Sequence, residues 1–124
     1  MRAPPDALLD GLDVPRGTID RLLRYETLLK TWQQHMNLVG PSTLDAIWQR
    51  HFRDSAQLAR LVGPGLNWLD IGAGAGFPGL VLAAMEWGTV TLVESVAKKC
   101  RFLEAVIDEL GLTNATVRCA RVEA

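Results

Sequence analysis

The segment from Asp70 to Gly79, with the sequence DIGAGAGFPG, contains the residues best suited to bind a ligand. Its four glycines remove the Cβ atoms that would keep a ligand away from the backbone, and they allow positive φ angles. A helix that begins after such a turn presents unpaired backbone N–H groups toward the ligand. Asp70 precedes the glycines, and Glu94 lies 22 residues after Gly72. Together these features indicate a turn that binds an adenosine-type cofactor.

Two kinds of cofactor fit such a turn. The run from Gly74 to Gly79 matches G-x-G-x-x-G, the pattern that places a dinucleotide pyrophosphate on a helix N-terminus. S-adenosylmethionine has no phosphate, and its positively charged methionine part favours a nearby acid such as Asp70. A carboxylate at Glu94 can accept hydrogen bonds from both ribose hydroxyls of an adenosine. We therefore expect S-adenosylmethionine, with a dinucleotide-binding oxidoreductase and a purely structural glycine turn as alternatives. The candidate contacts are Asp70, Gly72, Gly74, Gly76 and Glu94.

Strands and helices must position these residues. Residues 67–71, 89–94 and 115–119 have the composition of short strands. Residues 77–86 and 97–110 have helical spacing of apolar positions, and Gly111 fits the C-terminal stop of the second helix. Because strands and helices alternate, the sequence predicts an α/β fold with a parallel sheet and right-handed crossovers.

The preceding region, residues 1–62, is predicted to be helical. Thr18 is a suitable N-cap, and apolar residues recur at helical spacing after it. Pro41 cannot continue that helix, and Ser42 with Asp45 resembles a capping box for the next one. The sequence leaves open whether this second helix is interrupted near residues 50–54. The run from Gly63 to Gly65 separates this region from a second unit, residues 66–124.

The composition indicates an ordinary globular protein but excludes few functions. The net charge of −1 does not by itself predict a nucleic-acid partner. The N-terminus lacks the apolar stretch of a signal peptide, and no apolar run is long enough to span a bilayer. We therefore expect a cytoplasmic protein without a membrane partner. Cys100 and Cys119 are expected to be free buried thiols, and no metal site is expected because the cysteines and histidines lack ligand spacing.

Five segments, taken together, resemble one family, the bacterial 16S rRNA guanine-N7 methyltransferase RsmG, also called GidB or glucose-inhibited division protein B. The R-H-x-x-D-S segment and the G-F-P-G ending of the glycine turn are far more specific than the glycine spacing. The matching segments are residues 32–39, 50–55, 70–79, 92–95 together with 98–103, and 121–123.

The resemblance implies a Rossmann-like class I S-adenosylmethionine methyltransferase fold, with the first three strands of its parallel sheet in residues 66–124. It implies methyl transfer to N7 of a guanine in 16S rRNA, with the small ribosomal subunit as partner. It also implies roles for single residues: Gly72 and Phe77 line the cofactor pocket, and Glu94, where the family often has Asp, holds the ribose. Val122 and Glu123 contact the adenine, and His51, Asp54 and Ser55 are positioning residues near the cofactor cleft.

Members of that family are longer and add further strands after the segment that matches this chain. In the doubly wound order the first strand is central, whereas here it would be an edge. We therefore expect a C-terminally truncated copy whose first strand offers an edge for association. A non-catalytic cofactor-binding remnant is an alternative to an active enzyme.

Several residues leave two interpretations open. His51 could position RNA or could hydrogen-bond Asp54, three positions later. The arginines at 50 and 53 and the basic cluster Lys98, Lys99 and Arg101 could contact phosphates or form a solvated helix face. Trp32 and Trp48 could pack in the core or stack on bases.

Overall fold

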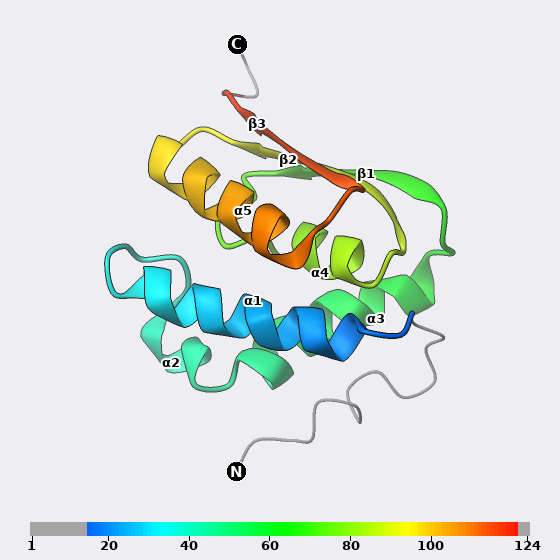
Figure 1. Cartoon of the computed structure of the whole chain (residues 1–124), viewed down its shortest axis with the longest axis horizontal. Helices are drawn as coiled ribbons and strands as arrows, with labels where there is room; N and C mark the ends of the chain where they lie inside the picture. Colours follow the sequence, from blue (N-terminus) through cyan, green and yellow to red (C-terminus); the bar gives the residue numbers. More distant parts are fainter. Residues whose placement is uncertain (1–14, 122–124) are drawn as a thin grey trace.

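The computed structural model describes residues 15–121 of the chain, which form three stacked layers (Figure 1). The upper layer is a sheet of β1 (Leu66–Ile71), β2 (Gly88–Glu94) and β3 (Ala115–Cys119). The middle layer contains α4 (Gly79–Ala84) and α5 (Ala97–Leu110). The lower layer contains α1 (Thr18–Gln33), α2 (Pro41–Leu44), the π-helical turn η2 (Trp48–Phe52) and α3 (Arg53–Leu61).

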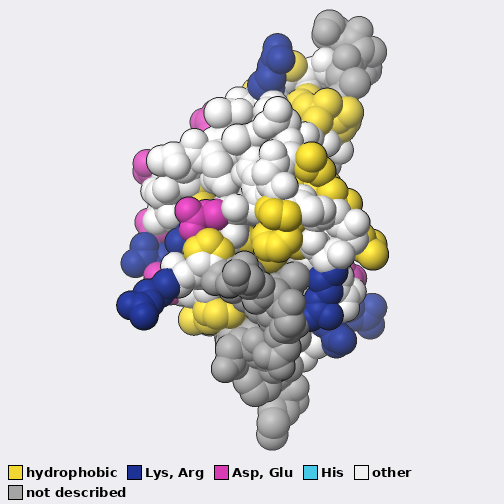
Figure 2. Space-filling view, turned by 90° about the vertical axis from the view of Figure 1, so that its right-hand side faces the viewer, with side chains coloured by type: hydrophobic (Ala, Val, Ile, Leu, Met, Phe, Trp, Pro, Cys, Tyr) yellow, Lys and Arg dark blue, Asp and Glu magenta, His cyan; other side chains and the backbone are white. Residues whose placement is uncertain are grey.

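The sheet is parallel, in the order β1-β2-β3, so β1 is an edge strand as the sequence predicts. Helices α4 and α5 lie on the same face of the sheet (Figure 1). On the other face Leu69 and Ile71 of β1 are 62% and 53% exposed. Figure 2 views the molecule from the side on which β1 lies, and it shows hydrophobic side chains at the surface there. Since parallel sheets are normally covered on both faces, one face of this sheet is open for a further layer.

Helix α1 packs on the middle layer through Leu22, Tyr25 and Leu29, which recur at helical spacing and are fully buried. The prediction that Thr18 caps this helix is wrong. The N-cap is Gly17, whose φ of 91° suits glycine. Thr18 is the first helical residue, and its hydroxyl donates a hydrogen bond backward to Pro15 O.

The predicted capping box at Ser42 and Asp45 is also wrong. Gly40 is the N-cap of α2 and Pro41 occupies its first turn, because the fixed φ of proline favours a helix start at that point. The chain then passes through η2 into α3 without a break. In η2 the Arg53 N–H donates to Trp48 O, five residues earlier, so one extra residue is accommodated in the turn.

The second unit follows the predicted order of elements. Helix α5 and strand β3 have the predicted bounds, and Gly111 ends α5 with a φ of 64°. Helix α4 is shorter than the predicted 77–86, because the glycine turn extends through Pro78 and the chain turns at Glu86, where φ is 54°. Cys100 is buried as expected, but Cys119 is exposed, because it lies at the end of β3, the other edge strand. None of the helices in residues 15–121 has the length and apolar character needed to cross a bilayer.

Candidate functional site

The glycine turn joins the carboxyl end of β1 to α4, and its first half faces open space. Gly72 and Gly74 have φ angles of 69° and 52°. A Cβ added at Gly72 would have no neighbouring atom within 4 Å, and one at Gly74 would meet only Gly72 O at 3.8 Å. The protein itself therefore does not require glycine at these two positions for lack of room. The backbone here is open to the close approach of a ligand.

The second half of the turn faces inward. A Cβ at Gly76, where φ is 96°, would lie 2.5 Å from both Leu80 Cδ1 and Tyr25 Oη. A Cβ at Gly79 would lie 2.8 Å from a carboxylate oxygen of Asp70. Gly76, a predicted cofactor contact, is buried, and its missing side chain makes room for protein atoms. Packing therefore explains these two glycines.

Asp70 and Glu94 lie on the same face of the sheet, at its carboxyl edge. Asp70 pairs in register with Leu92, and Glu94 is two residues further along β2, so the strand alternation turns both side chains toward the helices. The carboxylate of Asp70 accepts a hydrogen bond from Gly79 N at 3.0 Å. Burial raises the pKa of Asp70 above its usual value, and the bond from Gly79 opposes that rise.

Glu94, the last residue of β2, hydrogen-bonds to the turn from the neighbouring strand. Its Oε1 accepts a hydrogen bond from Gly74 N at 2.7 Å, and its Oε2 accepts one from Val96 N at 2.9 Å. Burial raises the pKa of this carboxyl, but these N–H donors and the nearby Lys99 outweigh burial, so the pKa lies below its usual value. Glu94 is therefore ionised at neutral pH although its residue is only 6% exposed.

The carboxylates of Asp70 and Glu94 distinguish between a dinucleotide and S-adenosylmethionine as the ligand of the turn. A dinucleotide needs free N–H groups at the helix N-terminus for its pyrophosphate. Here the N–H groups of Gly74 and Gly79 donate to carboxylates, and those of Gly72 and Ala73 both donate to Val93 O. A phosphate would meet occupied donors and adjacent negative charge. A neutral ribose and a cationic group fit these surroundings, so the residues present suit S-adenosylmethionine.

A row of stacked rings connects the glycine turn to the lower layer. Phe77 stacks on His51 with ring centroids 4.6 Å apart and planes 6° from parallel, and on Tyr25 at 5.5 Å. The Tyr25 hydroxyl donates a hydrogen bond to Ala75 O inside the turn. Burial, and to a smaller extent the charge of Asp70, raises the pKa of Tyr25 well above its usual value, so this hydroxyl stays protonated. Tyr25 thus holds both the backbone and the aromatic residue of the turn.

His51 forms a side-chain hydrogen bond that neither interpretation of the sequence included. Its Nε2 pairs with Thr43 Oγ1 at 3.0 Å, in place of the hydrogen bond to Asp54 that the spacing suggests. Burial lowers the pKa of His51, Asp54 opposes this change, and Arg50 adds to it. The imidazole is therefore predominantly neutral at pH 7.

The structure brings the R-H-x-x-D-S segment against the F-P part of the turn. An open depression of about 260 Å³ lies between them. Ser55 is buried and Asp54 is exposed, while Phe77 and Pro78 form the opposite wall. The residues that line the depression are Arg50, His51, Asp54, Ser55, Leu58, Phe77 and Pro78. Arg53, also considered for RNA contact, is exposed and does not line it.

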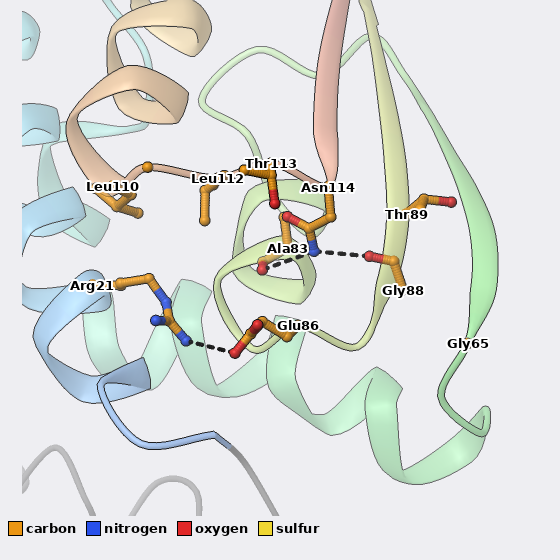
Figure 3. Close-up of a pocket in the computed structure, with 11 residues that line it drawn as sticks. Arg21, Gly65, Ala83, Glu86, Gly88, Thr89, Leu110, Leu112, Thr113 and Asn114 are labelled. Atoms are coloured by element: carbon orange, nitrogen blue, oxygen red, sulfur yellow. Dashed lines mark hydrogen bonds and ion pairs between the residues drawn. The ribbon is translucent and has the colours of Figure 1, made fainter.

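Another cavity, of about 310 Å³, lies at the opposite edge of the sheet, where the strands begin (Figure 3). Arg21 faces Glu86 across it at 3.4 Å, and the Asn114 amide donates to the carbonyls of Ala83 and Gly88. None of the predicted site residues lines this cavity. Its polar groups join α1, α4 and the strand starts to one another, which indicates a structural role.

Two residues of the site, Tyr25 and Thr43, were missed by sequence reasoning. Tyr25 belongs to the apolar stripe of α1, between Leu22 and Leu29, and that position predicts only core packing. An aromatic residue with a polar hydroxyl in such a stripe is the one available signal. Val122 and Glu123, the predicted adenine contacts, lie outside the described residues. Within residues 15–121 there is no cluster of three or more His, Cys, Asp or Glu suited to a metal ion.

Comparisons with known sequences agree on one family. The family model GidB, described as rRNA small subunit methyltransferase G, matches residues 18–124. A protein from Jannaschia sp. (strain CCS1), named ribosomal RNA small subunit methyltransferase G, is 51% identical over 106 residues, 81% of this chain and 50% of that protein. One of the same name from Hyphomonas neptunium (strain ATCC 15444) is 48% identical over 119 residues, 95% of this chain and 57% of that protein. The chain spans about half the length of these curated relatives.

Solved structures agree on the fold. A SAM dependent methyltransferase from Aquifex aeolicus superposes with a TM-score of 0.52 at 22% identity, over 77% of this chain and 47% of that chain. A protein-L-isoaspartate O-methyltransferase superposes with a TM-score of 0.58 at 18% identity, over 95% of this chain and 42% of that chain. The fold is thus the Rossmann-like one of class I methyltransferases, as expected. Since the family model covers residues 18–124, the chain belongs to the GidB family, described as rRNA small subunit methyltransferase G.

Proposed function

We propose that this chain binds S-adenosylmethionine as part of a methyltransferase that modifies N7 of a guanine in 16S rRNA of the small ribosomal subunit. Membership in the GidB family supports the reaction class. The observation that carries the cofactor assignment is the pair of carboxylates, Asp70 and Glu94, which take up N–H donors of the glycine turn. A dinucleotide would need those donors for its phosphates.

Each residue of the turn then has a role. Gly72 and Gly74 leave the backbone open to the cofactor, and the carboxylate of Glu94, which accepts hydrogen bonds from the N–H groups of Gly74, Val96 and Ser95, keeps its remaining acceptor capacity for the ribose. Asp70 supplies negative charge near the methionine part, and Phe77 lines the pocket beside it. Val122 and Glu123, in the segment after β3, are proposed to contact the adenine.

The proposed chemistry needs positioning more than proton transfer. Guanine N7 already carries an in-plane lone pair, so no proton leaves before attack and no strong base is required. When bound, S-adenosylmethionine supplies the methyl group. The task of His51, Asp54 and Ser55 is then to hold the guanine in line with that group. The neutral imidazole of His51, stacked on Phe77, suits contact with an uncharged base.

Calorimetry with S-adenosylhomocysteine tests the cofactor site in the chain as it is. Gly74→Val places a side chain where the ligand is proposed to lie and should weaken binding at least about tenfold, equivalent to about 1.4 kcal/mol. Gly65→Val is the matched control, because Gly65 also has a positive φ, of 85°, and open space around it, but it precedes β1 at the opposite edge of the sheet. Equal binding by both variants would contradict the proposed site, and tight binding of NAD alone would favour the oxidoreductase alternative.

Methyl transfer needs a separate assay. Small subunits from a strain that lacks this modification, incubated with the chain and methyl-labelled cofactor, should become labelled at a guanine N7. Cofactor binding without transfer would favour the alternative of a non-catalytic cofactor-binding remnant. We further propose that residues 66–124 bind the cofactor and that the helical region, residues 1–62, contributes to positioning the RNA. An rRNA substrate also implies a cytoplasmic location.

We also propose that the open edge of β1 pairs with a second copy of the chain. An edge strand presents unpaired backbone donors and acceptors, and Leu66 and Leu69 are 48% and 62% exposed along it. Light scattering should show a dimer, and Leu69→Lys should shift it toward the monomer. A monodisperse wild-type monomer at high concentration would rule out this association.

A further inference from the structure

A groove of about 320 Å³ lies between the end of α1 and the first turns of α5, apart from the His51 depression. It is lined by Thr31, Trp32, His35, Met36, Lys98 and Arg101. Both helix ends lie on the side where the strands end, to the left in Figure 1. The groove is therefore on the same side of the molecule as the glycine turn.

The rim of the groove carries two positively charged side chains that form no ion pair with other residues of the described part of the chain. Lys98 and Arg101 are exposed, and in residues 15–121 neither has an ion-pair partner. Lys98 also lies in the first turn of α5, which contains no acidic residue. Cations at a helix N-terminus are unfavourable, because the helix dipole has the same sign there. Lys98 at the helix start and Arg101 in the next turn, both beside the groove, fit an anionic ligand supplied from outside.

The wall of the groove contains an aromatic ring held in place by the core. Trp32 is half-buried, and Phe102 packs against its indole with ring centroids 5.7 Å apart and planes 64° from parallel. Met36 adds a polarisable apolar surface beside it. A fixed indole next to cations is the combination that binds single-stranded nucleic acid, since bases stack on the ring and phosphates contact the cations.

We propose that this groove binds one nucleotide of a single-stranded RNA segment, with its base on Trp32 and its phosphate at Lys98 and Arg101. The inference rests on the proposed rRNA substrate and adds a second RNA contact to it. An acidic peptide would satisfy the cations but would leave the indole without a stacking partner, so RNA is the better match.

Packing connects the groove to the depression at His51. Phe102 contacts Tyr25 at 6.4 Å between ring centroids, Tyr25 contacts Phe77 at 5.5 Å, and Phe77 stacks on His51. A nucleotide held at Trp32 is thus fixed relative to the proposed target position through a continuous row of rings. The groove would hold a neighbouring part of the RNA while the guanine is presented to the turn.

Fluorescence anisotropy with a 3′-labelled single-stranded RNA of about twelve nucleotides tests the groove in the full chain. Trp32→Leu keeps an apolar side chain at this position but removes the ring, and it should weaken binding roughly tenfold at every salt concentration, whereas Trp32→Tyr should restore most of the affinity. The double variant Lys98→Gln and Arg101→Gln should flatten the slope of log Kd against log salt by about 0.7, the value for one neutralised phosphate on a single strand. Arg118→Gln, an exposed arginine on β3, is the control and should bind with nearly the wild-type salt slope.

The outcomes separate this inference from the proposed function. If the wild-type chain binds RNA and both groove variants bind it equally well, the groove assignment is overturned. That result would favour a protein partner at the groove and would leave the proposed rRNA substrate unaffected. No RNA binding by a folded wild-type chain that binds S-adenosylhomocysteine would overturn both. Circular dichroism and thermal melting of Trp32→Tyr and the charge variants show whether each is folded, and the charge variants test the groove even if Trp32→Leu does not fold.

Discussion

Replacing Gly76 with alanine tests the inward half of the glycine turn most directly. The change adds one methyl group at a residue that is buried between α1 and α4. That methyl would lie 2.5 Å from Leu80 Cδ1 and 2.5 Å from Tyr25 Oη, closer than real Cβ contacts. It would also force a non-glycine residue to adopt a φ of 96°.

The two effects have separate magnitudes. The strained backbone costs about 1–3 kcal/mol, and overpacking of a filled core costs about another 1–3 kcal/mol. The Tyr25 hydroxyl must also move away from Ala75 O, which weakens its hydrogen bond. We expect a total loss of roughly 4 kcal/mol in the free energy of unfolding, a large part of the total of about 5–15 kcal/mol for a small domain.

Gly72→Ala is the matched comparison. Its φ of 69° is also positive, but no atom lies within 4 Å of the added methyl, so only backbone strain of about 1–2 kcal/mol remains. Urea denaturation followed by circular dichroism measures both variants under one set of conditions. Equal losses for Gly72→Ala and Gly76→Ala, or full tolerance of Gly76→Ala, would refute the packing argument and with it the close approach of Tyr25 to the turn.

Three further variants probe neighbouring groups. Tyr25→Phe should lower the free energy of unfolding in urea denaturation by about 1–3 kcal/mol, because Ala75 O loses its donor. In the double variant with Gly76→Ala the two losses should be less than additive. Strict additivity would argue against the clash between Tyr25 and the added methyl group. Asp70→Asn should leave thermal stability at pH 7 unchanged or higher, since burial raises the pKa of Asp70 and the folded state disfavours its charge, but calorimetry should show weaker S-adenosylmethionine binding; a loss of stability without a loss of affinity would mean a structural role alone. Because the pKa of His51 is lowered in the folded state, the unfolded chain binds more protons, and the free energy of unfolding should fall as the pH drops through the usual value of 6.5. Thermal melting between pH ~7 and ~5 should show a weaker pH dependence for His51→Phe, which keeps a ring on Phe77. An unchanged pH dependence in this variant would exclude His51 as its source.

Local signals made much of the fold predictable. Helix α5 has a clear apolar stripe and ends at Gly111, and β3 has a short alternating pattern bounded by turns, so both elements could be assigned from neighbouring residues. The alternation of strands and helices predicted a parallel sheet, and the doubly wound order, with only its first three strands present, predicted that the first strand would be an edge. The helix starts were less predictable, because Thr18 and Ser42 have suitable side chains while the backbone conformations of Gly17 and Gly40 decide where the helices begin.

The candidate site was predictable only in part, for the same reason. The glycines, Asp70 and Glu94 lie within one strand–turn–helix–strand unit, so spacing alone indicates their proximity. That spacing does not reveal that Glu94 bonds to Gly74 N or that Asp70 bonds to Gly79 N, since both bonds depend on the turn geometry. The contact of Tyr25 with the turn depends on how two distant helices pack, and nothing in the local sequence specifies it.

The bond from Tyr25 to Ala75 joins residues that are 50 positions apart, and this separation has a consequence for folding. Closing a flexible loop of that length costs roughly 3.5 kcal/mol in chain entropy. The turn between β1 and α4 can form locally, but its final shape must wait until α1, made early in synthesis, meets a segment made much later. The cofactor pocket should therefore be among the last parts of the molecule to mature, and amide exchange in a refolding experiment should show protection of α5 before protection of the glycine turn.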